Sequence, residues 1–101
     1  MDWNSLSNAT IIVEIGKRLK DYRLKKKFSQ RELAVRAGIS LFTVAQIEKG
    51  NPVSISMLLP VMRVLRVLDN LEMLLPEIGP SPIEIMKLKG KIPQRIQTKK
   101  S

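Results

Sequence analysis

The sequence predicts an all-α fold with five helices. Apolar residues recur every three or four positions through residues 10–75, which is the spacing of one helix face. Serines suited to helix N-caps and glycines suited to helix ends separate these stretches. No strand pattern is convincing, although residues 83–88 could form either one more helical turn or a short strand. With 101 residues, 44% of them hydrophobic, the chain can form one core but is short for two domains.

The first helix is predicted from Thr10 to Lys26 or Lys27. Its expected inward face consists of Ile11, Ile15, Leu19 and Tyr22. Residues 1–10 show no apolar pattern, so we expect a flexible N-terminal arm there. The helical domain is therefore expected to cover residues 11–76.

The second helix is predicted over residues 30–37. Ser29 and Glu32 match a capping box, in which the serine hydroxyl accepts from the Glu32 amide and the Glu32 side chain returns to the Ser29 amide. Phe28 is placed to act as a hydrophobic staple, and Gly38 stands where a left-handed residue ends a helix. The expected inward residues are Leu33, Ala34 and Ala37.

Ser40 is the predicted N-cap of a third helix over residues 41–49, in which Val44 and Ile47 face inward. The fourth helix has two candidate caps, Ser54 and Ser56. Pro60 lacks a backbone donor and disfavours a helical residue before it, so we favour the later start, at Ser56. The expected inward residues of the fourth helix are Leu58, Val61, Met62, Leu65 and Leu68.

A short fifth helix is predicted over residues 70–75, with Asp69 or Asn70 as its N-cap. Its expected inward residues are Leu71 and Leu74. Prolines and a glycine interrupt the chain after this helix, and basic residues follow. We expect residues 77–101 to be a proline-containing extension and a flexible, disordered basic tail.

The formal charge of +9 is concentrated in two blocks. Residues 17–27 hold seven basic side chains and one acidic one, and residues 87–101 hold six basic side chains and no acidic one. Such blocks attract the phosphates of nucleic acids, because neutralising phosphates releases condensed counterions. The alternative is a solvated basic face with a disordered tail.

The composition argues against several classes of protein. The chain has no Cys and no His, which excludes a disulfide scaffold, a thiol nucleophile and the common zinc sites. No phosphate-binding loop or acid/base pair stands out, so we expect no enzyme activity, no metal and no cofactor. The apolar runs are shorter than the roughly 18 residues of a membrane span, and no secretory signal is evident, so a cytoplasmic protein with no membrane partner is expected.

Residues 28–50 carry the most informative motif, two short helices joined through residues 37–40. In such a unit the second of the two helices enters the major groove of DNA, while the first lies across the backbone. The pattern of Ser-Gln, Glu-Leu-Ala, Ala-Gly, Ser and Ile-Glu with a closing Gly closely resembles the Cro/repressor (XRE) class of helix-turn-helix proteins. The resemblance covers about residues 11–75, and it implies a five-helix domain that binds double-stranded DNA.

The resemblance also implies roles for individual residues. Gln30 matches a residue that contacts DNA and braces the recognition helix, although it could be only the first residue of its helix. Phe42 matches an exposed recognition position, although it could instead belong to the core or to a dimer contact. Arg23 and Glu48 match a structural pair that ties the first helix to the end of the third. The full set of expected DNA-binding residues is Gln30, Arg31, Ser40, Leu41, Phe42, Thr43, Gln46, Lys49 and Asn51.

A narrower resemblance lies after the motif. Residues 70–72, 74–76 and 81–82 are similar to the tail of HipB-like regulators, the DNA-binding partners of HipA-type kinase toxins. This resemblance implies a protein that represses its own toxin–antitoxin operon and binds a HipA-like kinase. The alternative is a solitary or phage-type repressor without a toxin, and a kinase-like reading frame directly downstream would decide between the two.

A homodimer is expected, because one short recognition helix buries too little surface for tight binding and two half-sites multiply the specificity. The candidate interface residues are Leu71, Met73, Leu75 and Ile78.

Overall fold

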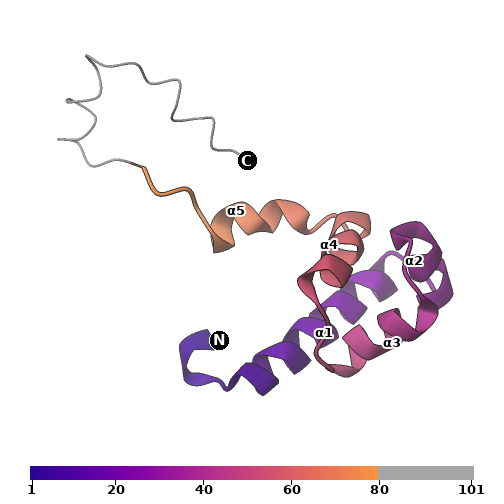
Figure 1. Cartoon of the computed structure of the whole chain (residues 1–101), viewed down its shortest axis with the longest axis horizontal. Coiled ribbons are helices and arrows are strands. Elements are labelled where there is room, and N and C mark those ends of the chain that lie inside the picture. Colours follow the sequence, from indigo (N-terminus) through magenta and orange to yellow (C-terminus); the bar gives the residue numbers. More distant parts are fainter. Residues whose placement is uncertain (80–101) are drawn as a thin grey trace, which may run out of the picture. The chain divides into compact units, whose positions relative to one another are not determined.

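The computed structural model describes residues 1–79 and confirms the all-α prediction, since this part of the chain contains no strand (Figure 1). The chain divides into two units, Met1–Leu71, which contains α1 to α4, and a second unit that begins at Glu72. The α-helices are α1 (Asn8–Lys25), α2 (Gln30–Ala37), α3 (Leu41–Lys49), α4 (Ile55–Val64) and α5 (Leu71–Leu74), with 3-10 turns at Trp3–Ser5 and Leu68–Asn70.

The core of the first unit is aliphatic. Helices α1 to α4 and the turn after α4 all contribute to it, and α2 and α3 have the predicted bounds. Its buried residues are Leu19, Leu33, Ala34, Val44, Ile47, Val61, Leu65 and Val67. Because these side chains come from all four helices, the core holds α3 against the rest of the unit.

The first four helices end in the same way. At each end a residue with a left-handed backbone closes the last turn, and the amide of the next residue donates to a carbonyl five positions earlier. The left-handed residues are Lys27, Gly38, Gly50 and Arg66. At three of these ends the next residue, Phe28, Ile39 or Val67, is apolar and packs into or against the core. The helix ends therefore turn the chain back toward the interior.

The buried face of α1 differs from the predicted one. It contains Gly16, Leu19 and Arg23, whereas Ile15 and Tyr22 are 38% and 42% exposed. Gly16 permits a close approach to α3, since a Cβ at this position would overlap the carbonyl oxygen of Ile47. This approach rotates α1 so that Gly16 rather than Ile15 faces the core. The predicted face was wrong because a glycine does not count as apolar in a hydrophobic pattern.

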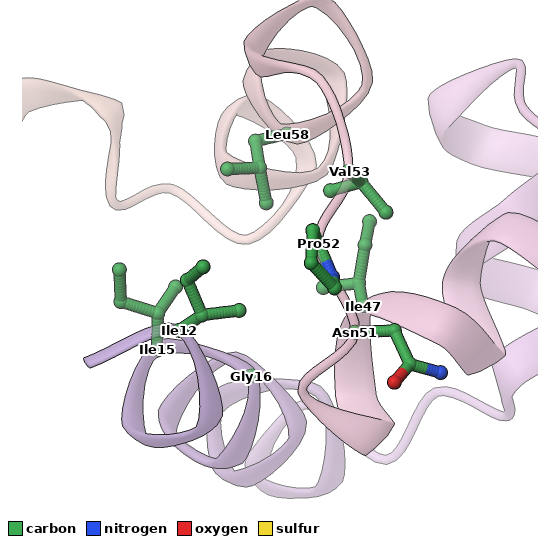
Figure 2. A pocket seen from close by; sticks show the side chains of 8 residues that line it. All are labelled: Ile12, Ile15, Gly16, Ile47, Asn51, Pro52, Val53 and Leu58. Carbon is green, nitrogen blue, oxygen red and sulfur yellow. The ribbon is translucent and has the colours of Figure 1, made fainter. Parts of the chain in front are cut away.

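Ile15 instead lines an apolar groove between α1 and α4. Figure 2 shows Ile12 and Ile15 on α1 facing Leu58 of α4, with Pro52 and Val53 of the α3–α4 loop beside them. The groove accounts for the partial exposure of the α1 isoleucines.

The first helix begins earlier than predicted. Helix α1 begins directly after Ser7 rather than at Thr10, and Trp3–Ser5 form a 3-10 turn before it. The Ser7 hydroxyl accepts from the Thr10 amide at 3.1 Å, which makes Ser7 the N-cap. The guanidinium carbon of Arg18 lies 4.9 Å from the centre of the Trp3 ring, so the turn packs on α1.

Helix α4 begins and ends earlier than predicted. Its N-cap is Ser54 rather than Ser56, and Pro60 lies inside the helix. The Met57 and Leu58 amides donate to the Ser54 carbonyl at 3.0 and 3.3 Å, so the first turn of the helix is complete before Pro60. Pro60 therefore costs the helix only the one hydrogen bond that its own missing amide would have donated. The helix ends at Val64, and the predicted inward residues Leu65 and Leu68 lie beyond it.

Helix α5 is a single turn that follows directly on the 3-10 turn at Leu68–Asn70. Leu74, which was predicted to face inward, is 69% exposed. The predicted disordered tail falls mostly on residues 80–101, which lie outside the described part of the chain. Within residues 1–79, no helix combines the length and the hydrophobicity needed to cross a bilayer.

The contact at Gly16 yields a stability prediction. Inside a helix, alanine is normally more favourable than glycine by about 1 kcal/mol. At position 16, however, the Cβ of Gly16→Ala would collide with α3. We expect the free energy of unfolding to fall by about 3 kcal/mol, in the range of overpacked cores. Urea unfolding followed by circular dichroism measures it. Gly79→Ala, where a Cβ meets no atom within 4 Å, is the control, and a gain in stability from Gly16→Ala would contradict the prediction.

Candidate nucleic-acid interface

Serine caps fix the starts of both helices of the α2–α3 unit. The Ser29 hydroxyl accepts from the Glu32 amide and the Ser40 hydroxyl accepts from the Thr43 amide, both at 3.0 Å. The Glu32 carboxylate pairs with Arg36 at 3.1 Å rather than with the Ser29 amide, so the second half of the predicted capping box does not form. Each helix thus begins at a defined residue, which fixes where the first turn of α3 lies.

A buried ion pair joins α1 to the end of α3. Arg23 Nε lies 2.7 Å from Glu48 Oε2, and Arg23 Nη2 lies 3.0 Å from Glu48 Oε1. The side chains of Arg23 and Glu48 are only 8% and 5% exposed. The paired, parallel geometry suits guanidinium and carboxylate, and it fixes orientation as well as distance.

Two further hydrogen bonds extend this pair to α2. Arg23 Nη1 donates to the Phe28 carbonyl at 2.7 Å, and Gln30 Nε2 donates to Glu48 Oε1 at 2.9 Å. Within residues 1–79, every buried side-chain nitrogen and oxygen has a hydrogen-bond partner. The start of α2 and the end of α3 are therefore held by the same buried carboxylate.

The outer side of α3 is open. Its inner residues Val44 and Ile47 are buried, as predicted, whereas Phe42 is 71% exposed and Leu41 is 37% exposed. The other expected DNA-binding residues divide into the half-buried Gln30, Thr43 and Gln46 and the exposed Arg31, Ser40, Lys49 and Asn51. The fold thus places all of these residues at or near the surface, on α2, on α3 and in the loop after α3.

The charge around this unit is positive. In residues 1–79 the ion pairs involve Lys17, Arg18, Arg23 and Arg36, which neutralise the acidic side chains of α1, α2 and α3. The exposed cations of residues 1–79 outside these pairs are Lys20, Lys25, Lys26, Lys27, Arg31, Lys49, Arg63 and Arg66. An uncompensated positive surface beside an open helix turn suits a polyanion.

Two features of the site were not predicted in full. The resemblance implied that Gln30 braces the recognition helix, but it did not identify Glu48, 18 positions away, as the partner. The left-handed backbone of Lys27 was also missed, although its place before an apolar residue and a serine N-cap resembles that of Gly38.

Comparison with known proteins agrees with this geometry. A family model described as Helix-turn-helix matches residues 19–68. This part of the chain is a helix-turn-helix domain of the XRE type. Such domains bind DNA, and the chain is a DNA-binding transcriptional regulator. A search of curated proteins found no match.

The buried ion pair generates a second stability prediction. Arg23→Met leaves Glu48 buried without its charged partner, so the free energy of unfolding should fall by about 3–5 kcal/mol. Adding Glu48→Met should recover much of this loss, because the apolar pair has no buried charge. Lys17→Met, which breaks the exposed pair with Asp21, is the control and should cost less than about 1 kcal/mol. Equal losses for Arg23→Met and Lys17→Met in urea unfolding would contradict the prediction.

Proposed function

We propose that this regulator binds an operator in its own promoter and represses its own operon. The observation that carries the proposal is the open first turn of α3 on a helix whose inner side is fixed by the core and by the Arg23–Glu48 pair. A rigid helix with an exposed first turn is what insertion into the major groove requires. We propose repression rather than activation because regulators that resemble the XRE class usually repress.

Sequence recognition is assigned to α3. The Gln46 carboxamide can bond both the acceptor and the donor that adenine presents in the major groove, and Thr43 can bond either kind of group. Phe42 and Leu41 suit the methyl group of thymine. Phe42 is 71% exposed, so its ring is accessible to such a methyl group. The proposed operator half-site is therefore rich in A·T pairs.

Contacts to the DNA backbone are assigned to the residues around α3. Gln30 and Arg31 begin α2, Ser40 caps α3, and Lys49 and Asn51 lie at its far end. Backbone contacts set register and orientation without reading sequence. The bond from Gln30 to Glu48 supports this assignment, because it holds the start of α2 in a fixed relation to α3.

We also propose a homodimer through α5 and the residues after it. Leu71 is half-buried, and Met73, Leu75 and Ile78 are 85%, 73% and 97% exposed. An apolar group of this kind is typical of a surface that a partner covers. Two copies would present two recognition helices to the two half-sites of an operator.

Sedimentation at micromolar concentration tests the dimer. The wild-type chain should sediment as a dimer, and Leu75→Glu should weaken association by at least about 2 kcal/mol, as for a central interface contact. The exposed Glu77→Gln is a matched control and should leave association unchanged. A wild-type monomer would contradict the proposal.

The proposed protein partner is a HipA-like kinase toxin. Its support is the resemblance of residues 70–72 and 74–76 to HipB-like tails, while the resembling residues 81–82 lie outside the described part of the chain. The alternative is a solitary or phage-type repressor, and a kinase-like gene directly downstream favours the toxin partner. As a regulator of transcription, the protein is proposed to act in the cytoplasm.

A fluorescence anisotropy titration tests the DNA-binding function. DNA from the gene's own promoter and a scrambled duplex are compared near physiological salt, and tight binding to the promoter alone is expected. Gln46→Ala should lower discrimination at one base pair by about 1–3 kcal/mol. Equal binding of the wild-type chain to both duplexes would contradict an operator-specific regulator, and an equal loss of Gln46→Ala on both would remove this residue from base recognition.

A further inference from the structure

Lys27 adopts a backbone conformation that a lysine rarely takes. Its φ of 63° lies in the left-handed region, where a Cβ crowds the following carbonyl and glycine does not. At the equivalent ends of α2 and α3 the left-handed residues are Gly38 and Gly50. The chain therefore uses glycine in this motif at two helix ends, and at the end of α1 it carries a strained lysine instead.

The strained lysine occupies a rigid place beside the proposed interface. The next residue, Phe28, packs against the core, and its carbonyl accepts from the buried Arg23 guanidinium at 2.7 Å. The Arg36 guanidinium covers the Phe28 ring, with its carbon 4.5 Å from the ring centre. Ser29 then caps α2, and Gln30 is bonded to Glu48. Lys27 therefore lies just before Gln30, in a segment that is held by the same hydrogen-bond network that fixes α3.

Lys27 differs from the two lysines before it. Lys25 is the last residue of regular helix and Lys26 has ordinary right-handed dihedrals, so neither carries backbone strain. Lys27 is exposed and takes part in none of the ion pairs of residues 1–79. Strained residues are often found at functional sites. Arg66, beyond the end of α4, carries the same strain, so Lys27 is distinguished by its position close to the start of α2.

We propose that Lys27 is a dedicated contact to a DNA phosphate. This inference rests on the proposed DNA-binding function and adds to it one residue with a defined task. The ammonium group supplies a positive charge close before Gln30, on a chain segment that the Arg23–Phe28 and Gln30–Glu48 hydrogen bonds hold in place. Because a phosphate contact carries no base information, Lys27 strengthens binding to every sequence alike.

The chain supplies a matched control in Arg66. This residue has a φ of 64° and closes α4 with the same hydrogen-bond pattern that Lys27 uses to close α1. It lies at the opposite end of α4 from the loop that follows α3. Replacing either residue by glycine removes one positive charge and relieves the strain at one left-handed position, so the two variants make matched changes at different places in the fold.

The experiment measures thermal stability and DNA binding for Lys27→Gly, Lys27→Gln and Arg66→Gly. Both glycine variants should raise Tm by about 4 °C through relief of backbone strain. Only the two Lys27 variants should weaken binding, about fivefold per subunit near 0.15 M salt, with a salt slope reduced by about 0.9. The loss should be the same on promoter DNA and on a scrambled duplex. A more stable protein that binds DNA less tightly is the distinctive result for Lys27→Gly.

Other outcomes overturn the inference. Unchanged binding by Lys27→Gly, or an equal loss in Arg66→Gly, would mean that Lys27 adds only general positive charge. A loss in Lys27→Gly that Lys27→Gln does not share would assign the effect to the backbone rather than to the ammonium group. If the wild-type chain binds neither duplex, the proposed function itself fails; if it binds and Lys27→Gly binds equally well, only the present inference fails.

Discussion

The buried pair of Arg23 and Glu48 is the interaction on which the arrangement of this domain depends. Removing two charges from water costs several kcal/mol for each, so such a pair is tolerated only when its geometry is complete. Here it is complete: the guanidinium meets both carboxylate oxygens and the Phe28 carbonyl, and the carboxylate also accepts from Gln30. One polar cluster thereby fixes α1, the start of α2 and the end of α3 in a single geometry.

The outer surface of α3 depends on that inner arrangement. Val44 and Ile47 are buried on one side, and Glu48 is fixed in the last turn, so α3 has little freedom to shift. Because α3 is held in this way, the Phe42 side chain in its first turn stays exposed instead of packing into the core of the domain.

The helix ends show a second balance, between stability and function. A common hydrogen-bond pattern closes α1 to α4, and glycine is the least strained residue at its left-handed position. Gly38 and Gly50 follow this rule, whereas Lys27 and Arg66 do not. Close packing sets a stricter requirement at Gly16, since any side chain there would overlap α3. The chain thus tolerates strain at exposed ends but none where two backbones meet.

The sequence by itself determined the helix-turn-helix unit, because caps and stops act within a few residues. Ser29, Ser40 and Gly38 bond to backbone groups no more than four positions away, so the bounds of α2 and α3 follow from local pattern. The pairing of Arg23 with Glu48, 25 positions apart, was expected only through a family resemblance. Tertiary structure alone decided which face of α1 is buried, where α4 begins and which atoms hold Gln30. These features depend on how closely neighbouring helices approach, and that distance is set by side chains remote in the chain.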